Sequence, residues 1–150
     1  MKVLTANLSD IARLEEIAKA SYKKMEFEGE YDSAYFQKTA EMQIDNESYI
    51  ILKCVDDNII LGGLFAIIIP ELYSPKTTLV CQYAMQADPQ LPFITQGRVI
   101  IKLIKKLEDI ASALNANSIC FSADKKYDLS GFFEKKGYIE IEKKYARRLK

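Results

Sequence analysis

The clearest pattern of apolar and polar positions along the chain lies between residues 95 and 114. Apolar side chains recur there at steps of three and four residues, which places them on one face of a helix. This stripe consists of Ile100, Leu103, Ile104, Leu107, Ile110, Ala111 and Leu114. The pattern predicts a helix from Thr95 to Leu114 with one buried face, and Asn115 or Asn117 can supply its left-handed stop.

The amino-terminal third predicts a short edge strand and two helices. Residues 1–6 form a short apolar segment that is typical of an edge strand. Ser9 and Asp10 can cap a helix whose apolar face extends to Met25. We expect an acidic, glycine-containing loop over residues 26–32 and a second helix over residues 33–44.

Apolar runs rich in β-branched residues predict the middle strands of a sheet. Residues 47–55 and 59–69 form two such runs, joined by the hairpin turn Asp56-Asp57-Asn58. Gly62 and Gly63 inside the second run predict a bulge or a close approach by another backbone. A loop is expected over residues 70–76, which contain two prolines, and the next strand over residues 77–87.

The carboxy-terminal part predicts a buried strand over residues 118–123, a charged loop, and a short helix. That helix begins at Asp128 or Ser130 and ends at Gly137, and residues 138–149 alternate like a last strand or strands. The order of elements predicts an α/β (α+β) fold, with a mixed central sheet flanked by helices on both faces. We find no repeat or linker, so residues 1–150 are predicted to form one domain.

Composition excludes several classes of function. The 21 basic and 21 acidic residues balance, so no global charge attracts the chain to nucleic acid or to an anionic membrane. The absence of histidine removes the commonest general base near neutral pH and most zinc sites. The three cysteines lie in apolar strand-like runs without motif spacing, which suits free thiols in a reducing cytoplasm. The longest apolar run stops at Pro70 and is too short for a membrane span.

One stretch has the features of an anion-binding site. A strand ends at the turn Asp88-Pro89, and the polar cluster Thr95, Gln96, Gly97 and Arg98 precedes the long apolar stripe. Backbone amides and the dipole at a helix N-terminus attract an anion, and a guanidinium group suits phosphate. Every helix has such an end, so the alternative is that Thr95 is only an N-cap.

The segment from Ala87 to Tyr138 resembles the acyl-CoA-binding core of the GNAT acetyltransferase superfamily. In that family a strand ending in a V-x-P-like turn leads to an R/Q-x-x-G-x-G/A loop and a long helix. A further strand and a short helix with a Y-E-K-x-G-F-like run follow. The turn here is Ala87-Asp88-Pro89 and the last run is FFEKKGY, residues 132–138. The closing run KKYARRL, residues 143–149, resembles divergent GNAT-like proteins of tailed bacteriophages.

The resemblance implies a GNAT-like acyl-CoA N-acyltransferase fold and acetyl-CoA as co-substrate. It implies that main-chain groups near Met85 and Ala87 bind pantetheine and that amides of Thr95, Gln96, Gly97 and Arg98 bind phosphate.

Two registers of the phosphate loop stay open. Counting forward from Pro89 puts Gly97 at the second glycine position, whereas counting back from Leu107-Glu108 puts Ile100 there. We prefer the first register, because glycine permits close backbone approach.

The catalytic positions depart from the family pattern. Phe133 stands where the family has the Tyr that protonates the leaving thiolate. Gln82 stands where related phage proteins tend to carry Glu, and an amide cannot act as a base. Tyr127, Tyr83 or an ordered water could replace the missing acid, so Gln82 and Tyr127 are the catalytic candidates by position.

Three functions follow from these observations. The first is an acyl-CoA-dependent N-acyltransferase that moves an acetyl group slowly to an unidentified amine, on a small molecule or a protein. The second is a catalytically degenerate GNAT-like binding or assembly module, in a phage-like setting. The third is an α/β module unrelated to acyl-CoA. The strand–loop–helix order favours cofactor binding, whereas the missing Tyr and Glu favour the second function. The oligomeric state stays open, with a homodimer among the arrangements.

Overall fold

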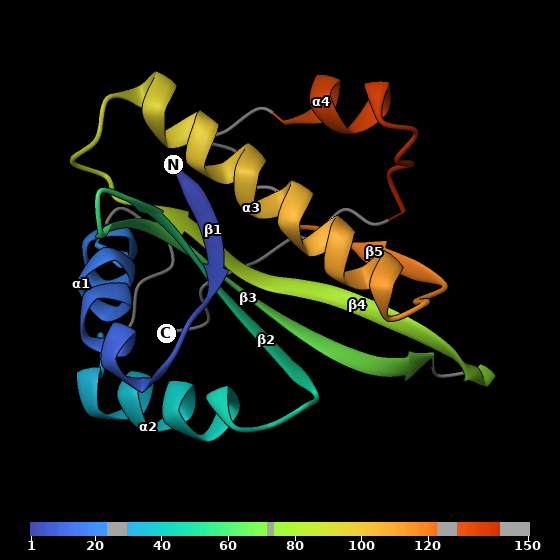
Figure 1. Ribbon diagram of the computed structural model, residues 1–150, viewed down its shortest axis with the longest axis horizontal. Helices are drawn as coiled ribbons and strands as arrows, with labels where there is room; N and C mark the ends of the chain where they lie inside the picture. Colours follow the sequence, from blue (N-terminus) through green and yellow to red (C-terminus); the bar gives the residue numbers. More distant parts are fainter. Residues whose placement is uncertain (24–29, 72–73, 123–128, 142–150) are drawn as a thin grey trace.

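The computed structural model describes residues 1–23, 30–71, 74–122 and 129–141. Within these residues a five-stranded sheet has the order β1-β2-β3-β4-β5 (Figure 1). Its strands are β1 (Lys2–Thr5), β2 (Tyr49–Asp56), β3 (Ile59–Glu71), β4 (Ser74–Ala87) and β5 (Ser118–Cys120). Neighbours from β1 to β4 are antiparallel, and β5 runs parallel to β4. The predicted mixed sheet is therefore confirmed.

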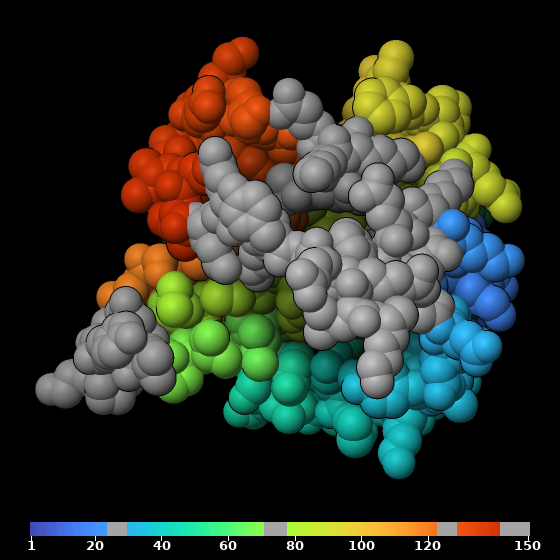
Figure 2. Space-filling view, turned by 180° about the vertical axis from the view of Figure 1, so that it is seen from behind, coloured from blue at the N-terminus to red at the C-terminus, as the bar shows by residue number. Residues whose placement is uncertain are grey.

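Helices cover both faces of this sheet, as predicted. The 3₁₀ turn η1 (Leu8–Asp10), α1 (Ile11–Tyr22) and α2 (Ser33–Ile44) lie on one side. Helix α3 (Phe93–Ala113) crosses the other side, and the short helix α4 (Ser130–Lys135) lies near it (Figure 1). Seen from behind, α1 and α2 (blue and cyan) lie on the opposite side of the molecule from α4 (orange-red; Figure 2).

The predicted apolar stripe of α3 forms the main core. Alternation along the strands directs every second side chain toward this helix, so Leu52 and Cys54 of β2 belong to its cluster. The fully buried large side chains of the cluster are Leu52, Cys54, Leu64, Val80, Val99, Ile100, Leu103, Ile104 and Leu107. Leu114 does not belong to it, because it follows the last helical residue and is 48% exposed.

A smaller cluster packs α1 against the opposite face. Leu14 and Ile17 of α1 belong to one cluster with strand residues whose side chains point away from α3, namely Ile51, Val55 and Ile60. The predicted close approach at the paired glycines is confirmed on both faces. A Cβ at Gly62 would lie 2.6 Å from Cγ1 of Val99 on α3, and one at Gly63 would lie 2.6 Å from Cδ2 of Leu14 on α1.

Several predicted boundaries are confirmed in physical detail. Asp57 and Asn58 adopt the positive φ angles, 45° and 66°, of a two-residue hairpin turn. Asn115, with φ 53°, supplies the left-handed stop after α3. The register shift between Cys54 and Val55 leaves an extra residue on β3 beside Gly62, which is the predicted bulge.

The predicted loop over residues 70–76 is wrong, because β3 continues to Glu71 and β4 begins at Ser74. Pro70 lies opposite Thr78 in the pairing of β3 with β4. The carbonyl of Thr78 accepts a hydrogen bond from the amide of Asn117, next to β5, and not from β3. Because Thr78 faces away from β3, the proline removes no ladder hydrogen bond. Residues 138–141 are not a strand, and the rest of the predicted last strand lies outside the described residues.

Candidate active site

The candidate site begins where β4 and β5 separate. Their ladder has three pairs and ends at Cys81 and Cys120. Two residues later, the amide of Ser122 donates to the side-chain Oε1 of Gln82 at 2.9 Å. The side chain of Gln82 thus accepts a hydrogen bond that a main-chain carbonyl of β4 would accept in a continuous ladder. In the described residues β4 runs on to Ala87 beyond this point, while β5 has ended.

A bulge in β4 explains the separation. The pairing of β3 with β4 shifts between Phe65, which faces Ala84, and Ala66, which faces Gln82, so Tyr83 is an extra residue. Such an insertion bends the bulged strand and increases its twist. The residues of β4 beyond Tyr83 therefore follow β3, with no described strand on their other edge.

The main-chain groups of Met85 and Ala87 point toward this open edge. The amide of Asp88 donates to the carbonyl of Leu61 on β3 at 2.8 Å. Because successive residues of a strand direct their polar groups to opposite sides, those of Ala87 and Met85 point away from β3. These are the two residues at which the resemblance implies pantetheine contacts, so that prediction is consistent with the strand geometry.

The amino-terminal end of α3 follows the open edge and differs from the prediction. The helix begins at Phe93 rather than Thr95, with Pro92 at the N-cap position, so Thr95 is not the cap. Periodicity could not reveal this start, because Phe93 and Ile94 are 64% and 70% exposed and lie outside the apolar stripe. The side chain of Pro92 forms no cap hydrogen bond, and the first turn contains no acidic residue.

Residues 95–98, at which the resemblance implies phosphate contacts, lie inside the helix and not in a loop before it. The amide of Gln96 donates to the carbonyl of Pro92 at 3.0 Å, and Gly97 and Arg98 follow within the same helix. Gln96 itself is buried, and its Nε2 donates to the carbonyl of Leu91 at 2.6 Å. The backbone amides available to an anion are therefore those of the first turn, including Ile94 and Thr95.

Gly97 is half-buried and Arg98 is exposed at this end of the helix. Among the described residues, a Cβ at Gly97 would meet no atom within 4 Å, so their packing does not require a glycine there. Glycine inside a helix costs about 1 kcal/mol relative to alanine. A glycine at position 97 is instead explained if a ligand approaches the helix backbone closely there. Arg98 is exposed in the next position.

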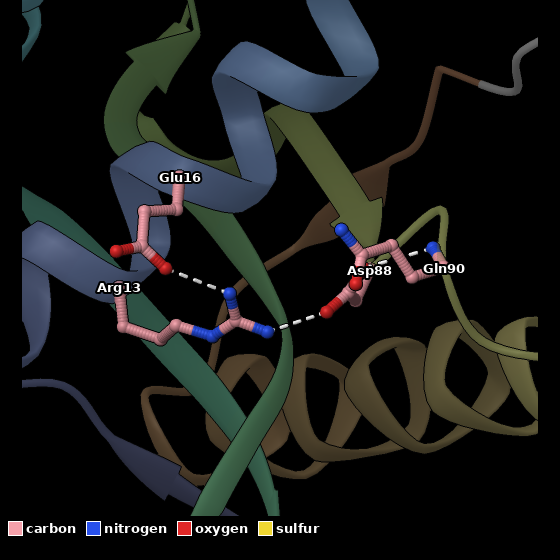
Figure 3. Close-up of polar contacts among 4 residues, drawn as sticks. All are labelled: Arg13, Glu16, Asp88 and Gln90. Atoms are coloured by element: carbon pink, nitrogen blue, oxygen red, sulfur yellow. Dashed lines mark hydrogen bonds and ion pairs between the residues drawn. The ribbon is translucent and has the colours of Figure 1, made fainter.

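An ion pair fixes the turn between β4 and α3. Asp88 is buried, and its carboxylate binds the guanidinium group of Arg13 on α1 (Figure 3). Its other oxygen accepts the amide of Gln90 at 2.9 Å, and Arg13 also binds Glu16 at 2.8 Å. Sequence reasoning found the turn and missed this contact, since 75 residues separate the partners.

The catalytic candidates have different environments. Gln82 is buried, and its amide carbonyl is engaged with the Ser122 amide, which gives it a structural role. Phe133 packs against Phe121 and Tyr138, with ring centroids 5.5 and 5.1 Å apart. Tyr127 lies outside the described residues, so its assignment stays a prediction.

Tyr83, at the bulge, is a described phenol beside the open edge of β4. Its hydroxyl donates to Oε1 of Gln43 on α2 at 2.6 Å. Partial burial, followed by the influence of Tyr49, raises the pKa of Tyr83 to about 12. The phenol is therefore protonated at neutral pH and can donate a proton or a hydrogen bond.

A groove of about 430 Å³ lies on the α1 and α2 side of the sheet. Its floor includes Phe65 of β3 with Tyr83, Ala84 and Gln86 of β4. Its walls are Ala18, Tyr22, Glu30, Tyr31, Asp32, Tyr35, Phe36, Thr39, Ala40 and Gln43. The groove depends on residues from four separate helices and strands, so no local sequence pattern reveals it.

Other kinds of site are absent from the part of the chain that the structure describes. No three His, Cys, Asp or Glu side chains are grouped closely enough to hold a metal ion. Among the described helices, none combines the length and apolar character that crossing a membrane requires.

Solved structures of other proteins share this fold. An aminoglycoside acetyltransferase from an uncultured soil metagenomic sample, solved in complexes with trehalose and with sisomicin, superposes with a TM-score of 0.69 at 19% identity, over 99% of this chain and 96% of that one. A predicted acetyltransferase with acetyl-CoA from Clostridium acetobutylicum gives 0.72 at 18% identity, with the same coverage. A transcriptional regulator from Bacillus halodurans gives 0.78 at 12% identity, over 99% of both chains.

These likenesses establish the fold. The chain has the mixed α/β fold of the GNAT acetyltransferases, as its sequence pattern predicts. No protein-family model and no curated protein sequence matches the chain.

Proposed function

We propose that the protein is an acyl-CoA-dependent N-acyltransferase that moves an acetyl group from acetyl-CoA to an amine. The observation that carries this proposal is the separation of β4 from β5 beyond Cys81 and Cys120. It leaves the main-chain groups of Met85 and Ala87 on an open edge that leads to the amino-terminal end of α3. An extended pantetheine amide and a pyrophosphate match these two features in that order.

The cofactor would use three kinds of contact. Main-chain groups of Met85 and Ala87 pair with pantetheine, first-turn amides including Thr95 bind phosphate, and Arg98 supplies a positive charge. Gly97 leaves room for the phosphate group on its side of the helix. The acetyl-CoA found in the Clostridium acetobutylicum neighbour supports a shared cofactor. No disulfide joins the described cysteines, which suits a reducing compartment such as the cytoplasm.

The reaction needs two proton transfers. The amine nitrogen attacks the thioester carbonyl, the new C–N bond forms, the C–S bond breaks, and its electron pair leaves on sulfur. One proton must leave the amine, and the thiolate must gain one. Gln82 cannot take the first, and Phe133 cannot supply the second.

These substitutions predict slow transfer. Loss of one positioned acid or base typically lowers the rate about 10²- to 10⁴-fold. Tyr83, on β4, and Tyr127 are the two phenols that we propose as candidates to protonate the thiolate. Comparing Tyr83→Phe with Tyr127→Phe in a thiol-release assay would show which phenol acts.

Calorimetric titration with CoA tests the proposal. We expect CoA and desulfo-CoA to bind about equally, because the site contacts phosphate and pantetheine rather than the thiol. Arg98→Ala should weaken binding about tenfold or more, since a charge-assisted contact contributes about 1.5–3 kcal/mol. Lys105→Ala, a charge change farther along α3, is the matched control. Rising salt should weaken binding by screening the phosphate contacts.

The negative result is equally informative. If folded protein binds no CoA at millimolar ligand, α3 simply begins without a cap, and the acyltransferase proposal fails. The chain would then be a GNAT-like binding or assembly module. The phage-type likeness lies in residues 143–149, outside the described residues, and does not enter this test.

A further inference from the structure

The groove beside α1 and α2 is lined by a continuous series of aromatic rings. Ring centroids are 5.4 Å apart for Tyr22 and Tyr31, 6.2 Å for Tyr31 and Phe36, and 5.9 Å for Phe36 and Phe65. Phe65 and Tyr83 continue the series at 6.2 Å. All five rings line the groove, so a ligand there meets aromatic faces and edges along its length.

The described charged residues that line the groove are acidic. Glu30 and Asp32 belong to its lining, and none of the described lining residues is lysine or arginine. Behind the wall, hydrogen bonds from Ser33 and then Gln37 lower the pKa of Glu15, which is therefore ionised at neutral pH. The ammonium group of Lys19, which is not a lining residue, lies 5.9 Å from the ring of Tyr31. The wall thus already attracts a cation from the chain itself.

One polar atom in the wall lacks a partner. The hydroxyl of Tyr31 is buried and makes no hydrogen bond to any described group. A buried hydroxyl without a partner costs free energy that a bound polar group can recover. Tyr31 therefore gives the aromatic wall a specific point of polar recognition.

The groove also adjoins the proposed pantetheine edge of β4. Its floor contains Tyr83, Ala84 and Gln86, and Met85 between them directs its main-chain groups to the proposed pantetheine edge. Its volume, about 430 Å³, lies within the range of about 300–1,000 Å³ that is usual for small-molecule sites.

We propose that this groove binds a primary monoamine whose ammonium group is carried on an aromatic or similarly flat apolar body. The proposal rests on the acyltransferase function and names the class of its acceptor. The aromatic series accounts for the body, and the two lining carboxylates account for the single positive charge. A sugar-based polycation such as sisomicin, found in one structural neighbour, carries more positive charges than the two lining carboxylates can pair with.

Four probes separate the contributions of ring and charge. Calorimetry should show 2-phenylethylamine binding about tenfold or more tightly than ethylamine, because burying the ring removes apolar surface from water. It should also bind more tightly than uncharged 2-phenylethanol, and sisomicin should bind no more tightly than ethylamine. Equal binding of ethylamine and 2-phenylethylamine, or tighter binding of sisomicin, would overturn the proposal.

Variants locate the binding site. Glu30→Gln combined with Asp32→Asn should weaken 2-phenylethylamine severalfold and leave 2-phenylethanol unchanged, while Asn at 32 can still cap α2. Tyr31→Phe removes the unpartnered hydroxyl and should weaken the binding of 2-phenylethylamine. Tyr138→Phe is its matched control on the other side of the sheet and should leave this binding unchanged. Equal losses in the two tyrosine variants would place the ligand elsewhere and overturn the proposal.

Each titration is made without CoA and with saturating CoA. Amine binding in the absence of any CoA binding would support the groove and reject the acyltransferase function. CoA binding with no preference for the aromatic amine would reject the groove and leave the acyltransferase function standing.

Discussion

The two faces of the sheet differ in how their side chains are used. On the α3 face, aliphatic residues interlock without exposure, and Leu103, Ile104 and Leu107 have no measurable accessible surface. On the α1 and α2 face, a smaller aliphatic cluster ends beside an aromatic groove with acidic lining. The same strands serve both faces, because alternate residues point in opposite directions.

This difference separates stability from recognition. The α3 face supplies most of the packed core and holds β4 in place up to the point where β5 ends. The other face leaves aromatic surface accessible and holds hydroxyl, amide and carboxylate groups near it. A ligand entering there would meet a preformed wall supported from behind by a rigid core.

Truncation of one side chain on each face should give the largest contrast. Leu107→Ala removes a fully buried side chain and should lower the free energy of unfolding by about 2–5 kcal/mol. Tyr35→Ala removes a groove side chain that is 71% exposed, and its effect should stay within about 0.5 kcal/mol. Denaturant melts measure both values. Similar losses for the two variants would remove the distinction between the faces.

Adding a methyl group at two glycines should give effects of opposite sign. Gly62→Ala would place Cβ 2.5 Å from the carbonyl oxygen of Gln86 and should cost about 1–3 kcal/mol. Gly97→Ala meets no atom and should stabilise by about 0.5–1 kcal/mol. Gly97→Ala should nevertheless weaken CoA binding, because the methyl group occupies space left for the ligand. Unchanged affinity would mean that the ligand does not approach this residue.

The geometry at the point where β4 separates from β5 should depend on Gln82. Gln82→Leu leaves the amide of Ser122 without its described acceptor and should cost about 1–3 kcal/mol. Gln90→Leu is the control, because Gln90 is exposed and uses its backbone amide rather than its side chain at Asp88. A loss no larger than that of the control would show that Gln82 does not hold the separated strands.

Acid should weaken the groove side through Glu15. Hydrogen bonds from Ser33 and Gln37 lower the pKa of Glu15 below 4.5 in the folded state. Its contribution to stability is therefore present above the unfolded value and is lost as pH falls through the folded value. The stability difference between the unaltered chain and Glu15→Leu should shrink below about pH 4.5 in melts at several pH values. A constant difference would contradict this assignment.

Regular elements were predictable because they depend on local periodicity. The α3 stripe, the Asp57-Asn58 turn and the Asn115 stop follow directly from residue type and spacing. The start of α3 was misplaced because Phe93 and Ile94 break the periodic pattern. The ion pair of Arg13 with Asp88, the bulge at Tyr83 and the aromatic groove all require residues distant in sequence. Their positions depend on strand register, which local patterns do not specify.

Amide chemical-shift mapping tests the central claim that cofactor and acceptor enter from different sides of β4. Adding CoA to ¹⁵N-labelled protein should shift the amides of Met85, Ala87, Thr95 and Gly97 most strongly. Subsequent addition of 2-phenylethylamine should shift Tyr22, Tyr31, Phe36 and Ala84. If CoA instead perturbs the groove residues and leaves the β4 edge and the start of α3 unchanged, this account of the two faces is wrong.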